Sequence, residues 1–349
     1  MQAEQKIFKY PYSYALEMGQ ELPGFELSYT TYGTRNADDS NIIWICHALT
    51  GNSNAAEWWD GLVGEGKYFD PAEYYIICAN VLGSAYGSTG PMSMNPLIQT
   101  CYYRAFPMLT IRDVVGAFEM LRQELQINKI RMCIGGSLGG QQALEWAVEV
   151  PDLCEELILI ASNALHSPWG IAFNESQRMA IEADPTYEVD TPEGGRMGMR
   201  AARSMALLSY RNYDTYNFTQ ARDNPDQIDE FRASSYQQYQ GDKFMKRFNA
   251  YSYWILSKLM DSHNVGRNRG GIVHALSLVK AKTLVLGIKS DLLFPLAEQQ
   301  FLAKHIPDAV FQEIDSLYGH DGFLIEYKQL GQVLKAWTES NGKLDHAVI

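Results

Sequence analysis

One serine lies between two pairs of glycines in the segment RMCIGGSLGGQQALEWA, residues 131–147. The apolar run before it is typical of a buried strand, and the run after it is typical of a helix. Ser137 therefore occupies a sharp strand-to-helix turn, which needs small neighbours because the two backbones approach closely. The helix that starts there directs free N–H groups and a positive dipole at the reacting oxygen. The pattern favours a nucleophilic serine over a purely structural glycine turn.

A serine nucleophile needs a base, and the base needs a carboxylate to orient it. Asp291 follows the apolar run KTLVLGIKS, and His320 follows the next strand-like run. Both residues come after predicted strands, where open α/β sheets build their sites, and the order Ser, Asp, His is that of α/β hydrolases. We therefore predict a triad of Ser137, Asp291 and His320. The less suitable candidates, in helical or connecting stretches or too close to His320, are His263, His274, His305 and Asp315.

An oxyanion hole completes this chemistry. It should come from the residue after the nucleophile and from a loop after an early strand. The segment NIIWICHALTGNS supplies that loop, so we predict the backbone N–H groups of Leu49 and Leu138 as the donors. His47, in the same loop, is as consistent with a structural role as with a catalytic one.

The elements that must position these residues alternate along the chain. Short apolar runs closed by polar residues predict buried parallel strands, and TIRDVVGAFEMLRQEL between two of them predicts a helix with a capping box at Thr110 and Asp113. The sequence of the first forty residues is typical of β-hairpins. Residues 166–274 contain helix-like segments and no such strand. We predict an α/β core of residues 1–165 and 275–349, with a mostly parallel sheet, and a helical lid insertion at 166–274.

Composition narrows the class of protein. The formal net charge of −12 argues against a nucleic-acid partner, which would require a basic face. The five cysteines form no CxxC pair and the histidines no metal-binding motif, so we expect free thiols and no metal. No export signal or membrane-length apolar stretch is evident in the sequence, and the expected location is the cytoplasm.

An ordered series of segments is more specific than the triad. HALTG, WWDGLVGEGKYFD, NVLGSAYGSTGP, GGSLGGQQALEWA, YQGDKF, SDLLFP and GHDGFL together resemble the homoserine O-acetyltransferase family of α/β-hydrolase-fold acyltransferases. The resemblance runs from about residue 8 to about residue 335. The chain departs from the usual family pattern at Asn52, Ala85 and Leu138, none of them in the triad.

The resemblance implies a first step of methionine biosynthesis. Acetyl-CoA, bound as a substrate and not as a tightly held cofactor, would acylate Ser137, and the hydroxyl of L-homoserine would then take the acetyl group. The family's acceptor-binding residues correspond to Arg203, Tyr210 and Asp321. An arginine can bind an α-carboxylate through two parallel hydrogen bonds, and an aspartate can pair with an α-ammonium. The family resemblance also implies a homodimer joined through the lid helices.

Three alternatives remain open at this stage. The same scaffold could use succinyl-CoA as donor or L-serine as acceptor. The triad alone would also serve a serine esterase, since most proteins with this triad pass the acyl group to water. A non-catalytic binding protein of this fold is the third alternative, although such proteins usually lack a triad member.

Overall fold

An eight-stranded sheet forms the centre of the computed structural model, which describes residues 3–342. Its strand order is β1-β4-β6-β5-β9-β10-β11-β12. The pairs β1/β4 and β4/β6 are antiparallel and the other five pairs are parallel, as predicted for a mostly parallel sheet. The strands are β1 Glu4–Tyr10, β4 Phe25–Tyr32, β5 Ile42–Cys46, β6 Tyr75–Ala79, β9 Ile130–Gly136, β10 Cys154–Ile160, β11 Lys282–Ile288 and β12 Val310–Ile314. Two small hairpins pair β2 (Tyr14–Ala15) with β3 (Glu21–Leu22) and β7 (Met94–Asn95) with β8 (Thr100–Cys101).

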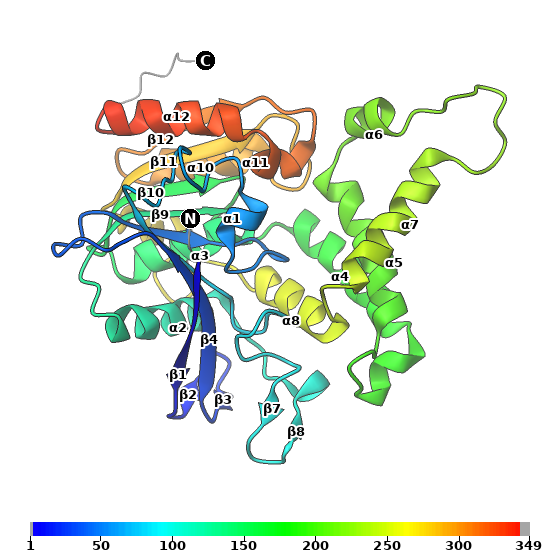
Figure 1. Ribbon diagram of the computed structural model, residues 1–349, viewed down its shortest axis with the longest axis horizontal. Coiled ribbons are helices and arrows are strands. Elements are labelled where there is room, and N and C mark those ends of the chain that lie inside the picture. Colours follow the sequence, from blue (N-terminus) through cyan, green and yellow to red (C-terminus); the bar gives the residue numbers. More distant parts are fainter. Residues whose placement is uncertain (1–2, 343–349) are drawn as a thin grey trace.

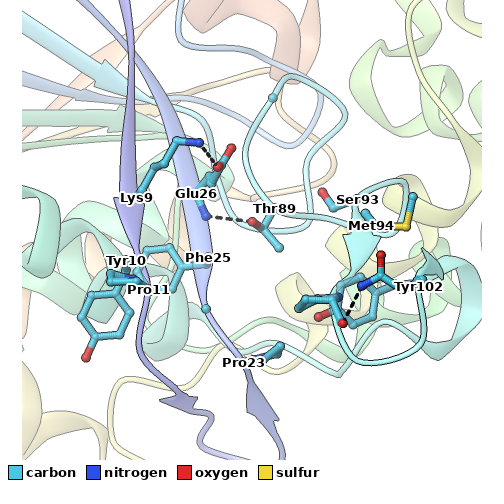
Figure 2. Close-up of a pocket in the computed structure, with 14 residues that line it drawn as sticks. Lys9, Tyr10, Pro11, Pro23, Phe25, Glu26, Thr89, Ser93, Met94 and Tyr102 are labelled. Atoms are coloured by element: carbon cyan, nitrogen blue, oxygen red, sulfur yellow. Dashed lines mark hydrogen bonds and ion pairs between the residues drawn. The ribbon is translucent and has the colours of Figure 1, made fainter.

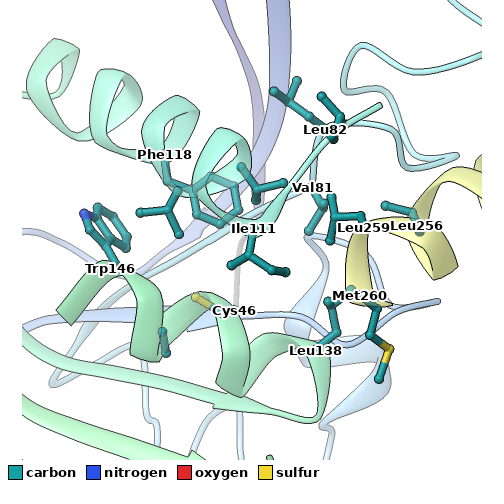
Figure 3. Close-up of a cluster of buried hydrophobic side chains, with 14 of the residues drawn as sticks. Cys46, Val81, Leu82, Ile111, Phe118, Leu138, Trp146, Leu256, Leu259 and Met260 are labelled. Atoms are coloured by element: carbon teal, nitrogen blue, oxygen red, sulfur yellow. The ribbon is translucent and has the colours of Figure 1, made fainter. Parts of the chain in front are cut away.

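Apolar side chains on both faces of the sheet explain the continuously apolar strand sequences. In β5, Ile42, Trp44 and Cys46 belong to one buried cluster, whereas Ile43 and Ile45 belong to the other. Successive side chains of a strand point to opposite faces, so a strand covered on both sides needs an unbroken apolar run. Figure 3 shows part of the first cluster, which includes Cys46 of β5 and the helix residues Phe118 and Trp146.

Helices cover both faces of the sheet. The first cluster includes residues of α2 (Ile111–Glu124), α3 (Leu138–Glu149) and α10 (Leu296–His305), and the second includes residues of α1 (Ala55–Trp58), α11 (Gly322–Ile325) and α12 (Tyr327–Glu339). The predicted capping box at the start of α2 is confirmed, with Thr110 and Asp113 each bonding the other's backbone N–H. The α/β-hydrolase architecture predicted from the sequence is therefore confirmed.

The predicted lid segment, residues 166–274, contains only helices and connections among its named elements. These are α4 Pro168–Glu182, α5 Arg196–Tyr210, α6 Tyr213–Thr219, α7 Arg232–Met245, α8 Ala250–Asp261, α9 Ile272–Ser277 and the 3-10 helix η2 Pro185–Val189. Figure 1 shows α5, α6 and α7 projecting from the core, with α8 between them and the sheet. Leu256, Leu259 and Met260 of α8 join the first core cluster, so this helix fixes the segment to the core (Figure 3).

Three further observations concern the described residues: the state of the cysteines, the character of the helices and the short 3-10 helices. All five cysteines are free, as predicted, and four of them are buried. Within residues 3–342, no helix combines the length and the apolar character needed to cross a membrane. Short 3-10 helices complete the elements at η1 Tyr103–Ala105 and η3 Gly319–Asp321.

Candidate active site

Ser137 lies at the tight turn between β9 and α3. Its φ of 56° and ψ of −126° are an unusual conformation for a residue with a side chain, and such conformations persist where the surroundings enforce them. Glycine is required beside it, because a Cβ on Gly139 would lie 2.1 Å from the Cys46 carbonyl oxygen. A Cβ on Gly135 would lie 2.3 Å from the backbone of Gly139. The glycines therefore allow three backbone segments to meet around the serine, as a nucleophile elbow requires.

Asp291 and His320 are brought together by the structure. The Nδ1–H of His320 donates to Oδ2 of Asp291 over 2.6 Å, in a buried environment. Oδ1 of Asp291 accepts the backbone N–H groups of Leu293 and Phe294 at 2.8 and 2.9 Å, so the carboxylate is fixed. With the proton on Nδ1, Nε2 of His320 carries the lone pair that a general base needs.

Aromatic rings surround His320, and one of them also contacts the backbone beside Ser137. The ring of Phe294 is stacked on that of His320 with centroids 5.0 Å apart, and the ring of Phe323 lies edge-on at 5.4 Å. A Cβ on Gly136 would lie 2.5 Å from Phe323, so one phenyl ring contacts both His320 and the residue before Ser137. The candidate Asp315, which directly follows β12, is not the partner of His320; its backbone N–H and carbonyl bond the side-chain amide of Gln329.

The loop after β5 is held by His47 and approaches the start of α3. Nε2 of His47 accepts the Val81 N–H at 3.0 Å, while its Nδ1–H donates to the Ala48 carbonyl at 2.8 Å. Burial lowers the pKa of His47 to about 4, so the ring is neutral at physiological pH and acts as a structural link. Leu138 is the first residue of α3, so its N–H has no i−4 partner within the helix. Leu49 lies in the loop that His47 fixes, as an oxyanion donor would require.

The acceptor-binding residues expected from the resemblance gather next to His320. Arg203 and Tyr210 both lie on α5, and the guanidinium carbon of Arg203 is 5.4 Å from the centroid of the Tyr210 ring. The Tyr210 ring lies 5.8 Å from that of His320. Burial raises the pKa of Tyr210, so its phenol remains a neutral donor. Nη1 of Arg203 is buried with no hydrogen-bond partner among the described residues, an unsatisfied cationic donor that an anionic ligand would satisfy.

Asp321 has a protein partner that was not predicted from the sequence. Its Oδ2 forms an ion pair with Nε of Arg211 over 2.8 Å, and both side chains are largely buried. Arg211 directly follows Tyr210, at the end of α5, and its guanidinium carbon lies 5.3 Å from the centroid of the Tyr318 ring. A substrate ammonium at Asp321 would therefore share this carboxylate with Arg211. The only sequence signal for Arg211 is its position next to a predicted site residue.

A row of polar side chains extends from α3 toward α10. Nε2 of Gln141 donates to Oδ1 of Asn163 at 2.9 Å, and Nδ2 of Asn163 donates to Oε2 of Glu298 at 3.0 Å. Burial raises the pKa of Glu298 to about 7; the hydrogen bond from Asn163 opposes this shift, and the negative charge of Asp291 adds to it. A second carboxyl group near the Asp291 carboxylate is therefore largely protonated below neutral pH.

We expect Glu298→Gln to stabilise the protein at high pH only. The folded-state pKa of Glu298 lies above its ordinary value of 4.5, so its contribution to the free energy of unfolding is present below pH 4.5 and is lost as pH rises through about 7. Glutamine mimics the protonated acid. Urea unfolding should show no difference from the parent at about pH 4 and a gain of about 1 kcal/mol at pH 8, discounted for partial exposure. Glu313→Gln, at an exposed strand position, is the control, and equal differences at both pH values would contradict the prediction.

Two surface pockets lie outside this group of residues. A pocket of about 640 Å³ lies between β1, β4 and the β7–β8 region, where Lys9 and Glu26 form an ion pair (Figure 2), and it contains none of the predicted site residues. A pocket of about 550 Å³ opens beside the loop after β5, lined by Asn52, Ser53 and Tyr86 among others. Among the described residues, no three His, Cys, Asp or Glu side chains are grouped so as to hold a metal ion.

Comparison with known proteins agrees with this geometry. The family model described as alpha/beta hydrolase fold matches residues 41–327. A homoserine O-acetyltransferase from Cyclobacterium marinum is 51% identical over 339 residues, covering 97% of this chain and 96% of that protein. The crystal structure of a homoserine O-acetyltransferase from Bacillus anthracis superposes with a TM-score of 0.91, at 24% identity and full coverage of both chains. The acetyl esterase MekB is also similar, with a TM-score of 0.82 and 26% identity over 95% of this chain and 96% of its own.

Proposed function

Because the chain belongs to the homoserine O-acetyltransferase family of α/β-hydrolase-fold enzymes, we propose that it transfers an acetyl group from acetyl-CoA to the hydroxyl of L-homoserine. The products would be O-acetyl-L-homoserine and CoA. The observation that carries this proposal beyond a generic hydrolase is Arg203, whose Nη1 is buried with no hydrogen-bond partner among the described residues. Its guanidinium lies beside Tyr210, whose ring is close to that of His320.

The geometry supports a two-step reaction through an acyl-Ser137 intermediate. In the first step, Nε2 of His320 accepts the hydroxyl proton while Oγ of Ser137 attacks the thioester carbonyl. The resulting oxyanion accepts hydrogen bonds from the N–H groups of Leu49 and Leu138, and its collapse breaks the C–S bond. His320 returns the proton to the departing CoA sulfur. In the second step the homoserine hydroxyl attacks the acyl-enzyme, His320 accepts its proton, and that proton finally restores the Ser137 hydroxyl.

Transfer must compete with hydrolysis. Water is present at about 55 M and an amino-acid acceptor near the millimolar range, so transfer needs a preference of about 6–7 kcal/mol. Positioning of the acceptor by Arg203, Tyr210 and Asp321 would supply part of this preference, and exclusion of water by the lid segment would supply more. The similarity to the acetyl esterase MekB makes hydrolysis the second candidate function.

Location and assembly follow from the same proposal. We place the enzyme in the cytoplasm, which suits a protein with five free cysteines. We further propose a homodimer joined through the lid helices. The exposed apolar residues Met197, Leu208 and Phe218 on α5 and α6 support it, because a partner would cover such surface.

A panel of two donors and two acceptors tests the substrates directly. We expect CoA thiol release from acetyl-CoA to rise at least tenfold on adding L-homoserine, and succinyl-CoA and L-serine to be poorer substrates. The release of free thiol is followed by absorbance and the acylated amino acid by mass spectrometry. An equal rate of thiol release with and without any acceptor would show an esterase-like hydrolase instead.

A further inference from the structure

The loop that carries Leu49 is anchored on both sides by hydrogen bonds, and the side chain of Leu49 itself is buried in the first core cluster. At its start, His47 bonds Val81, and the His47 carbonyl accepts Nε2 of Gln142 at 3.1 Å. At its far end, the Ser53 N–H donates to Oδ1 of Asn80 at 2.8 Å. Leu49 and Thr50 lie between these two anchors, where a turn bond joins the Gly51 N–H to the Ala48 carbonyl at 2.9 Å.

An arginine from the lid segment reaches this middle portion. Nη1 of Arg247 donates to the Thr50 carbonyl at 2.8 Å, and Nη2 lies 3.5 Å from the Thr50 hydroxyl. The same Nη1 donates to the hydroxyl of Tyr86 at 2.6 Å. Arg247 lies between α7 and α8, so its guanidinium connects the lid segment, the loop after β5 and the segment around Tyr86. The Arg247 side chain is exposed, so solvent screens these bonds, and they restrain the position of the loop more than they stabilise the fold.

The same guanidinium packs on a ring that also contacts the acceptor site. The guanidinium carbon of Arg247 is 5.0 Å from the centroid of Phe244, and that of Arg203 is 5.1 Å from the same centroid. Phe244 is buried near the end of α7. A single ring therefore joins the cation expected to bind the acceptor to the cation that holds Thr50.

We propose that Arg247 is a positioning residue for acyl transfer. It fixes Thr50 and thereby the direction of the neighbouring Leu49 N–H toward the oxyanion, and the buried ring of Phe244 supports its guanidinium. The proposal rests on the proposed function, because Leu49 matters only if an oxyanion forms at Ser137. In this role Arg247 acts through the loop and not by contact with a reacting atom.

The burst reaction with 4-nitrophenyl acetate tests this role without CoA or homoserine. Release of one equivalent of nitrophenolate reports acylation of Ser137, and its amplitude counts the folded sites. In Arg247→Met, which keeps the length of the side chain but has no donor, we expect an unchanged amplitude. The acylation rate constant should fall about 10–100-fold, because small misplacements of catalytic groups have effects of that size. The ester concentration for half-maximal rate should change less than threefold.

Two further variants and a control refine the test. Arg247→Lys can still donate to Thr50 and should recover part of the rate, whereas Tyr86→Phe removes one acceptor and should give a smaller loss than Arg247→Met. Arg200→Met, which removes a lid arginine paired with Asp242, should behave like the parent. If Arg247→Met unfolds and its burst amplitude is lost, the acylation rate constant of Arg247→Lys relative to that of the parent decides whether Arg247 has this role.

The outcomes separate this inference from the proposed function. An acylation rate in Arg247→Met within twofold of the parent overturns the inference, and so does an Arg247→Lys variant that is no faster than Arg247→Met. A parent enzyme that shows the burst but never acylates homoserine overturns the proposed acceptor, while the comparison of variants still decides the role of Arg247.

Discussion

Replacing Ser137 with alanine is expected to lower CoA release from acetyl-CoA by a factor of about 10⁴ or more. The reaction as proposed requires a covalent bond to the Ser137 oxygen, and no neighbouring hydroxyl occupies the same elbow position. The fold should survive, because alanine is smaller than serine and the backbone conformation at φ 56° already accommodates a Cβ. Thiol release under saturating acetyl-CoA and L-homoserine measures the loss.

Ser209→Ala is the matched control for this substitution. Ser209 is a buried serine of α5 whose hydroxyl donates only to the Ala206 carbonyl of its own helix, at 2.8 Å. It should retain activity within a fewfold of the parent. Residual CoA release above about one per cent in Ser137→Ala would point to another nucleophile, or to direct attack by the acceptor, and would revive the alternative of a protein that binds acyl donors without acylation.

Local sequence patterns predict the candidate site residues that directly follow strands. Ser137, Asp291 and His320 were predicted because each follows an apolar run, and the ends of parallel strands meet at one edge of a sheet. The elbow glycines carry the same local signal, since Gly139 must pass within contact of the Cys46 carbonyl. The pairing of His320 with Asp291 rather than Asp315 follows from strand order, which the chain order alone suggested.

The residues that the sequence could not locate depend on contacts between distant elements. Arg211 pairs with Asp321 only because α5 packs beside η3, and nothing in the segment SYRN distinguishes it from a solvated arginine. Arg247 sits in an ordinary helix connection, and its role appears only when Thr50 and Tyr86 lie against it. The raised pKa of Glu298 likewise requires burial next to Asp291, which helix periodicity does not encode.

Arg203→Met is expected to raise the KM for L-homoserine and to leave acylation of Ser137 nearly intact. Nη1 of Arg203 is buried and finds no hydrogen-bond partner within residues 3–342, so the α-carboxylate of the acceptor would complete its hydrogen bonding. Truncation of one member of a buried charged pair costs about 2–4 kcal/mol, or roughly 30–1000-fold in kcat/KM. Folding should not suffer, since the substitution removes a charged group with an unsatisfied buried nitrogen, and the methionine side chain can pack on Phe244 in place of the guanidinium.

A truncated acceptor shows whether the lower kcat/KM of Arg203→Met results from the lost contact with the α-carboxylate. 3-Aminopropan-1-ol keeps the hydroxyl and the ammonium of homoserine but lacks the carboxylate, so it should be a poor acceptor for the parent enzyme. Because this acceptor has no carboxylate for Arg203 to bind, Arg203→Met should hardly slow its reaction. The effects on kcat/KM of the substitution and of the missing carboxylate should therefore be far from additive. Arg200→Met, one helical turn earlier on α5, should affect neither acceptor. Equal losses for homoserine and for 3-aminopropan-1-ol would instead assign Arg203 to the packing of Phe244 and Tyr210, and the basis for preferring transfer over hydrolysis would then have to lie elsewhere in the lid.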